Sequence, residues 1–128
     1  MNIPRELRYT KSHEWVRVEG DTAVVGITDF AQNQLSDLTY AELPAPGDHF
    51  AAKDEIAVVE SVKAASDIYT PVAGTIEAAN DAAADNPELV NTDPYGEGWL
   101  FKIKPDNMGD VEALLDADQY EELVPEED

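Results

Sequence analysis

Lys63 lies between two apolar, strand-like stretches and is the residue of this chain best placed to do chemistry. Residues 58–74 read VVESVKAASDIYTPVAG, and Lys63 is one of only five lysines in the chain. A hairpin tip presents a long side chain to solvent while the flanking strands fix its backbone. Ala64, Ala65 and Ser66 are small enough to leave room for the pocket of a modifying enzyme. The pattern predicts that an enzyme acylates the Lys63 amine to build a swinging arm, although an ordinary solvated turn lysine is the simpler reading of a bare Ser-Val-Lys.

The elements that must position Lys63 are mostly short strands. Apolar alternation bounded by turn signals predicts strands at 14–18, 22–27, 38–43, 49–52, 55–62, 66–69, 74–79 and 99–104. Thr28 is suited to cap a short helix over 29–35. Residues that interrupt regular secondary structure, mainly Gly, Pro, Asn and Asp, recur between 80 and 98, and a single helical turn is expected at 87–90. Short strands with frequent turns favour a mainly β sandwich or barrel over a parallel α/β fold.

Beyond Pro105 the apolar period becomes helical. Two apolar faces are expected, one from Val111, Leu114 and Leu115 and the other from Tyr120, Leu123 and Val124. Asp110 and Asp118 are the predicted caps. Residues 105–128 hold ten acidic side chains and no Lys or Arg, so these helices should lie on the surface. We expect one domain over 1–128, with a core at about 7–104 and acidic helices at about 109–124.

The net charge of −20 is extreme for 128 residues. It argues against nucleic acid or an anionic membrane as a partner, because both would be repelled. Acidic residues spread along the chain fit a halophilic source, since at about 1 M salt the Debye length is only ~3 Å. The start has no apolar signal region, and no stretch approaches the roughly 18 apolar residues of a membrane span. We therefore expect a cytoplasmic monomer, without disulfides because cysteine is absent.

Sequence motifs along nearly the whole chain resemble one known family. They are, in order, SHEWVRVEG, GITDFAQNQL, ELPAPGD, VVESVKAASDIYTPVAGTI, NPELVN and DPYGEGWLFKIK. Together with the helical end they are similar to the glycine cleavage system H protein. The resemblance implies a barrel-sandwich hybrid of two antiparallel sheets, with short helices and a C-terminal helical segment. It also implies lipoate in amide linkage on Lys63.

The partners that this resemblance implies are enzymes, whereas the carrier itself catalyses nothing. Glycine decarboxylase (P protein) would load an aminomethyl group onto the arm, and the tetrahydrofolate-dependent aminomethyltransferase (T protein) would take it over. Dihydrolipoyl dehydrogenase (L protein) would reoxidise the arm, and a separate enzyme would attach lipoate.

Three further residues are assigned by the resemblance to a cleft for the loaded arm: Ser12, Glu14 and Asp67. A carboxylate beside the arm's amine favours its charged form, which suppresses loss of the one-carbon unit. From position alone, Glu14 could be surface charge, Ser12 could order a turn, and Asp67 could bond the hairpin backbone. His13 is interpreted as packing or a hydrogen bond rather than as a base.

Other carriers share the hairpin lysine. A lipoyl domain of a 2-oxoacid dehydrogenase system is shorter and normally linked to a catalytic core, and a biotin carrier has Met on both sides of its lysine. An H-like protein that relays lipoate to other enzymes is a third alternative, which intact Glu14 and Asp67 do not exclude.

Overall fold

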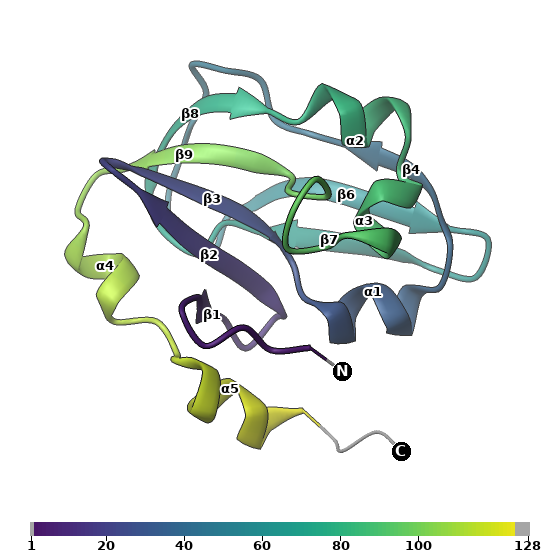
Figure 1. Cartoon of the computed structure of the whole chain (residues 1–128). Helices are drawn as coiled ribbons and strands as arrows, with labels where there is room; N and C mark the ends of the chain where they lie inside the picture. The colour runs from purple at the N-terminus through teal and green to yellow at the C-terminus, as the bar shows by residue number, and fades with distance from the viewer. Residues whose placement is uncertain (1, 125–128) are drawn as a thin grey trace.

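Two antiparallel sheets form the body of the protein in a computed structural model that describes residues 2–124 (Figure 1). The strands are β1 (Arg8–Tyr9), β2 (Glu14–Glu19), β3 (Thr22–Ile27), β4 (Leu38–Glu42), β5 (His49–Phe50), β6 (Glu55–Ser61), β7 (Ala65–Tyr69), β8 (Gly74–Ala79) and β9 (Phe101–Pro105). The helices are α1 (Asp29–Leu35), α2 (Asp81–Asp85), α3 (Glu88–Thr92), α4 (Gly109–Glu112) and α5 (Ala117–Leu123). The six-stranded sheet has the order β1-β2-β3-β9-β8-β5 and the three-stranded sheet the order β4-β6-β7. The predicted mainly β class with two antiparallel sheets is confirmed.

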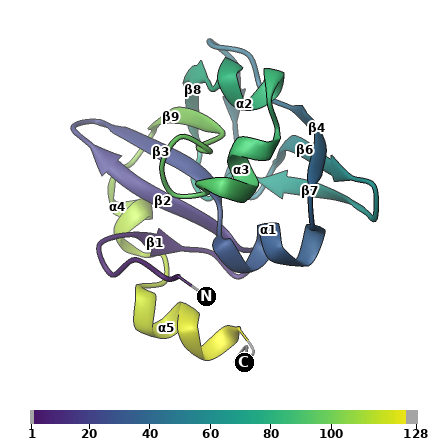
Figure 2. The ribbon, with the colours of Figure 1, turned by 45° about the vertical axis from the view of Figure 1, so that its right-hand side comes forward.

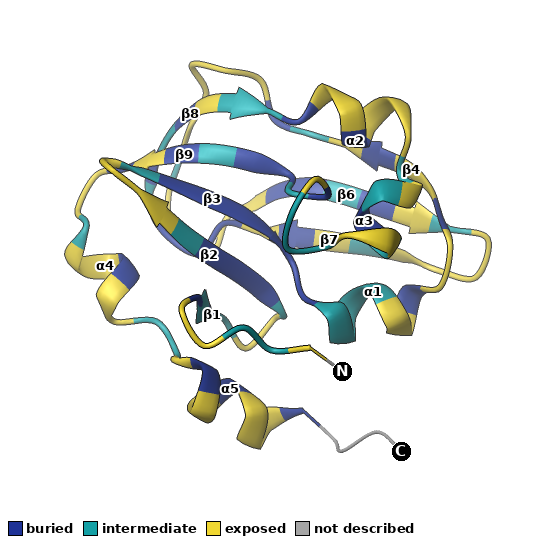
Figure 3. Cartoon of the chain, in the orientation of Figure 1, coloured by how far each residue is buried: buried dark blue, intermediate teal, exposed yellow. Residues whose placement is uncertain are grey.

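The main hydrophobic cluster fills the space between the two sheets, where buried positions of the strands face inward (Figure 3). Close packing on β2 and β3 requires a residue without a side chain at one place. Gly26 pairs with Trp15, and a Cβ at Gly26 would lie 2.7 Å from the indole Nε1. That indole nitrogen donates to the carbonyl of Pro94 at 2.9 Å, which holds the loop before β9 against the sheet.

A second hydrophobic cluster joins the two ends of the chain. It is formed by Leu7, Tyr9, Trp15, Val24, Ala117, Tyr120 and Val124. The backbone of Leu115 exchanges two hydrogen bonds with that of Tyr9, at 2.8 and 3.0 Å. In both ribbon views α5 lies beside β1 (Figures 1 and 2), so the C-terminal segment packs against the first strands. Within residues 2–124, no helix combines the length and hydropathy needed to cross a membrane.

The C-terminal caps differ from the prediction. Asp110 and Asp118 lie in the first turns of α4 and α5 and do not cap them, so both assignments were wrong. Asp116 caps α5: its carboxylate accepts from Gln119 N at 2.8 Å while the Gln119 side chain accepts from Asp116 N at 3.0 Å. This reciprocal capping box satisfies two backbone donors at the start of α5.

Several other boundaries also differ. The predicted apolar face of α5 includes Leu123, which is 48% exposed, because the helix turns Ala117, Tyr120 and the following Val124 inward. The strand β9 starts at Phe101 rather than at 99, since the Asn80 side-chain amide donates a hydrogen bond to the Trp99 carbonyl at 2.7 Å. The strand β1 and the helix α2 have no counterpart in the prediction, whereas α1 forms with Thr28 as its cap. The last four residues of the predicted acidic end lie outside the described residues.

Candidate functional site

Lys63 lies at the tip of the hairpin that joins β6 to β7, and it is exposed. The Ser61 hydroxyl accepts hydrogen bonds from the backbone N–H groups of Lys63 at 3.1 Å and Ala64 at 3.0 Å. Ser61 N also donates to the Ala64 carbonyl at 2.7 Å. Among the residues described, Lys63 takes part in no ion pair. The backbone of the tip is therefore fixed while the amine of Lys63 is accessible. The neighbouring Val62 is 88% exposed.

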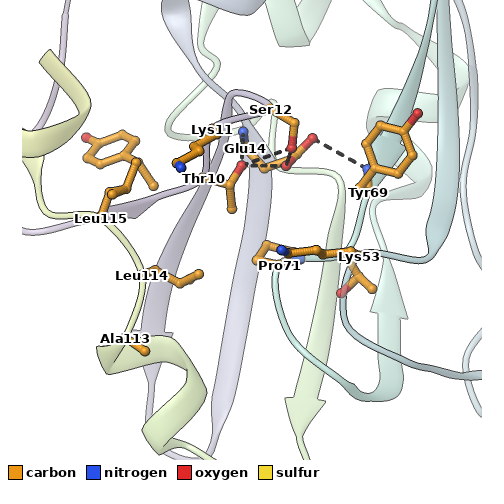
Figure 4. Close-up of a pocket in the computed structure, with 12 residues that line it drawn as sticks. Thr10, Lys11, Ser12, Glu14, Lys53, Tyr69, Pro71, Ala113, Leu114 and Leu115 are labelled. Atoms are coloured by element: carbon orange, nitrogen blue, oxygen red, sulfur yellow. Dashed lines mark hydrogen bonds between the residues drawn. The ribbon is translucent and has the colours of Figure 1, made fainter. Parts of the chain in front are cut away.

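Glu14, at the start of β2, is a buried carboxylate with only 1% of its surface exposed. Its Oε1 accepts from the Thr10 hydroxyl and from the Ser12 hydroxyl, each at 2.6 Å (Figure 4). Its Oε2 faces the backbone N–H of Tyr69, 3.4 Å away. Burial raises the pKa of Glu14, and these donors only partly oppose the rise. Within residues 2–124 no cation forms an ion pair with Glu14, so only neutral hydroxyl and N–H donors face its oxygens.

The turn at residues 10–14 brings these oxygen atoms together. His13 N donates to the Thr10 carbonyl at 3.2 Å, and Glu14 N donates to the Thr10 hydroxyl at 3.1 Å. His13 has a φ of 73°, which is uncommon for a residue with a Cβ. The left-handed residue reverses the chain between Ser12 and Glu14, so both side chains face the same oxygen cluster.

A cleft of about 690 Å³ opens beside Glu14 (Figure 4). Its walls come from the 10–14 turn, from the end of β7 and from the segment between α4 and α5. The lining residues are Tyr9, Thr10, Lys11, Ser12, Glu14, Lys53, Tyr69, Thr70, Pro71, Ala113, Leu114 and Leu115. Such a volume lies within the usual range of ligand pockets. Six of the twelve lining residues are polar or charged, and two of the five lysines of the chain are among them.

A second hollow of about 140 Å³ lies between α1 and β7. It is lined by Ser12, His13, Ile27, Phe30, Ala31, Gln34, Leu35, Ser66 and Ile68. Ser12 lines both hollows, and Ser66 is only three residues from Lys63. The smaller hollow thus lies between the hairpin that bears Lys63 and the oxygen cluster around Glu14.

The structure separates the three residues assigned to the arm cleft. Ser12 and Glu14 are joined directly, but Asp67 is exposed on β7 and lines neither hollow. Asp67 instead acts on Glu55: hydrogen bonding with Asp67, followed by the charge of Asp67, raises the pKa of Glu55. A role for Asp67 toward the arm stays a prediction. Thr10 was not predicted; the signal was its spacing, because Thr10, Ser12 and Glu14 alternate in one short polar segment.

His13 makes the kind of contact that was expected of it. Its Nδ1 lies 2.8 Å from the Tyr120 hydroxyl, and its ring packs on Phe30 with centroids 4.8 Å apart. Burial lowers the pKa of His13, which favours the neutral ring.

Comparison with known proteins gives one consistent family. The family model described as "Glycine cleavage H-protein" matches residues 7–127. The chain is 60% identical over 121 residues to a glycine cleavage system H protein of Psychrobacter cryohalolentis, covering 94% of this chain and 96% of the relative. It is 56% identical over 127 residues to one of Thermus thermophilus, covering 99% of each. A crystal structure of a glycine cleavage system H protein from Mycobacterium marinum superposes with a TM-score of 0.85 at 40% identity, covering 92% of this chain and 95% of that one.

Proposed function

The chain belongs to the glycine cleavage H-protein family, and on that premise we propose that it carries lipoate as an amide on Lys63. It is a lipoyl carrier of the glycine cleavage system, which takes the aminomethyl group from glycine decarboxylase to the tetrahydrofolate-dependent aminomethyltransferase. This reading is favoured over a 2-oxoacid dehydrogenase lipoyl domain or a relay protein, because every relative described above is a glycine cleavage H protein.

The residues around Lys63 fit an acylated lysine. The amine is exposed and unpaired among the described residues, and small exposed Ala64 and Ala65 follow it. The bonds from Ser61 fix the backbone, so an attaching enzyme meets a preformed turn instead of having to order one. When bound, lipoate supplies a disulfide that accepts the aminomethyl unit as it is reduced and is later reoxidised by dihydrolipoyl dehydrogenase.

The observation that carries the proposal is the buried charge of Glu14. A carboxylate that is 1% exposed and has no cationic partner among residues 2–124 is costly to keep ionised. A primary ammonium brought next to it would restore a paired charge and lower its pKa again. Glu14 therefore favours the protonated form of an amine at the end of the arm, and a protonated nitrogen has no lone pair with which to expel sulfur.

The remaining lining suits the other parts of the arm. Ile27, Phe30 and Leu35 give the smaller hollow an apolar surface for a hydrocarbon chain. Ser12 stands where the two hollows adjoin, and its hydroxyl proton points to Glu14. These side chains bind and orient the arm and keep water from the amine, while the chemistry belongs to the partner enzymes.

The partner set is part of the proposal. We infer that the chain is a non-catalytic component that meets glycine decarboxylase, aminomethyltransferase, dihydrolipoyl dehydrogenase and a lipoate-attaching enzyme. The cytoplasmic location stays a prediction of the sequence.

The deciding experiment measures the intact mass of the native protein and maps its modified peptide. One lipoyl amide on Lys63 is expected, and biotin or an unmodified lysine would contradict the proposal. Lys63→Arg should keep the fold, since the tip is held by backbone bonds, and should abolish glycine-dependent turnover with glycine decarboxylase. Lys104→Arg is the control because Lys104 is exposed and lies outside both hollows, and this variant should keep its lipoyl group on Lys63.

A further inference from the structure

We propose that Tyr120, on the C-terminal helix α5, is a positioning residue for the oxygen cluster of Ser12 and Glu14. The inference rests on the proposed role of Glu14 at the arm site. It extends that site to a helix that contributes no side chain to either hollow.

The Tyr120 hydroxyl joins two elements that are remote in sequence. It lies 2.8 Å from His13 Nδ1 and 2.7 Å from Thr28 Oγ1, and the Tyr120 side chain is fully buried. Its ring stacks on Tyr9, with centroids 4.7 Å apart and planes at 11°. Tyr9 itself lines the cleft and is paired with Leu115, so Tyr120 supports the cleft wall as well as the 10–14 turn.

One arrangement of protons satisfies all of these contacts. Ala31 N donates to Thr28 Oγ1 at 3.2 Å, so the Thr28 hydroxyl is free to donate to Tyr120. Tyr120 then donates to the unprotonated Nδ1 of a neutral His13. Burial, opposed by the bond with Thr28 and reinforced by the charge of Glu14, raises the pKa of Tyr120 to about 12, so the phenol keeps its proton.

This chain of bonds acts on the residue that lies between Ser12 and Glu14. His13 adopts a left-handed backbone conformation that a residue with a Cβ seldom keeps unless its surroundings hold it. Its carbonyl accepts from Thr28 N at 3.0 Å, and its ring is held by Tyr120 and Phe30. Without the phenol hydroxyl, the imidazole of His13 loses its hydrogen-bond partner, and the turn that orients Ser12 and Glu14 loses one of its supports.

Tyr95 offers a matched control. Its hydroxyl also makes two hydrogen bonds, accepting from Asp29 N at 3.0 Å and donating to the Asn2 carbonyl at 2.6 Å. Its hydrogen bonds do not reach the 10–14 turn, and it lines neither hollow. Tyr95→Phe therefore removes the same group from a comparable network elsewhere in the fold.

The test compares Tyr120→Phe with Tyr95→Phe. In protein without the arm, we expect Tyr120→Phe to speed amide hydrogen exchange at His13 and Glu14 about tenfold, equivalent to ~1.4 kcal/mol. In protein loaded by glycine decarboxylase, we expect release of formaldehyde to rise severalfold. Tyr95→Phe should change neither. Exchange that stays at the wild-type rate in Tyr120→Phe, or that rises equally in both variants, would overturn the inference.

A double-mutant cycle with Glu14→Gln separates positioning from general destabilisation. If Tyr120 acts through Glu14, Tyr120→Phe adds nothing to the release rate once Glu14 is replaced, and fully additive effects would refute this. The cycle also separates the two proposals. Faster release in Glu14→Gln but not in Tyr120→Phe rejects only the positioning role. Unchanged release in Glu14→Gln rejects the proposed role of Glu14, and exchange in the arm-free protein then decides whether Tyr120 orders the turn.

Discussion

Replacing Glu14 by Gln removes the buried charge and leaves the shape of the side chain nearly unchanged. The amide oxygen can still accept from the Thr10 and Ser12 hydroxyls, which now lie 2.6 Å from Oε1. The new NH₂ group would face the N–H of Tyr69, but that contact is already long at 3.4 Å. The substitution therefore tests the charge of Glu14 with little change in packing.

The size of the effect follows from the bond that is lost. A hydrogen bond to a charged group contributes about 1.5–3 kcal/mol, so losing it should speed release of formaldehyde from the loaded protein about 10- to 150-fold. The assay loads lipoylated protein with glycine and glycine decarboxylase, removes the enzyme and follows formaldehyde at pH 7.5. Glu42→Gln makes the same charge change on an exposed residue outside both hollows and should release at the wild-type rate.

Stability gives an independent check on the same variant. Because the pKa of Glu14 is raised on folding, the folded protein binds more protons than the unfolded chain above pH ~4.5. Wild-type stability should therefore fall as the pH rises through the folded-state pKa, and Glu14→Gln should lack this fall. Urea unfolding of the arm-free proteins between pH 4 and 8 measures the difference. A release rate within twofold of wild type, in a variant that shows the altered pH dependence, would refute the role of the charge.

Three other substitutions test separate parts of the structure. Asp67→Asn tests the role assigned to Asp67: faster release of formaldehyde would support that role, and a rate within twofold of wild type would fit its place outside both hollows. The same variant should lower the pKa of Glu55 in a carboxyl NMR titration. Ser61→Ala should cost about 1 kcal/mol by removing the acceptor at the hairpin tip, and should slow enzymatic lipoate attachment measured by mass. Gly26→Ala should lower the free energy of unfolding in urea by about 1–3 kcal/mol, because its Cβ would overlap Trp15.

Features set by neighbouring residues were predictable from the sequence. Thr28 caps α1 through a bond to Ala31 three residues on, and the tip that bears Lys63 is closed by Ser61 two residues before it. Both arrangements depend on local residue types and spacing, which a sequence displays directly. Asp116 shows the limit of such reasoning, because Asp118 is equally suited by type and is followed by Glu121 at the spacing at which Gln119 follows Asp116, so the local sequence does not choose between them.

The proposed arm site was predictable only in part. The resemblance supplied Ser12, Glu14 and Asp67, but no residue pattern tells that Glu14 is buried while Asp67 is exposed. Exposure depends on which elements cover each strand. The bond between His13 and Tyr120 spans 107 positions and has no periodic signature, so it appears only once the termini are folded together.

The hairpin that bears Lys63 is closed by residues next to it in sequence, whereas the cleft and the 10–14 turn depend on contacts with the C-terminal segment. Chains emerge from the ribosome N-terminus first, so the lysine hairpin is made well before Leu115 and Tyr120. The cleft gains its third wall and the support of its turn only when the last segment of the polypeptide docks on Tyr9. A chain cut short before α4 would still contain Lys63, yet it would lack both the segment that forms the third wall of the cleft and the helix that holds the 10–14 turn.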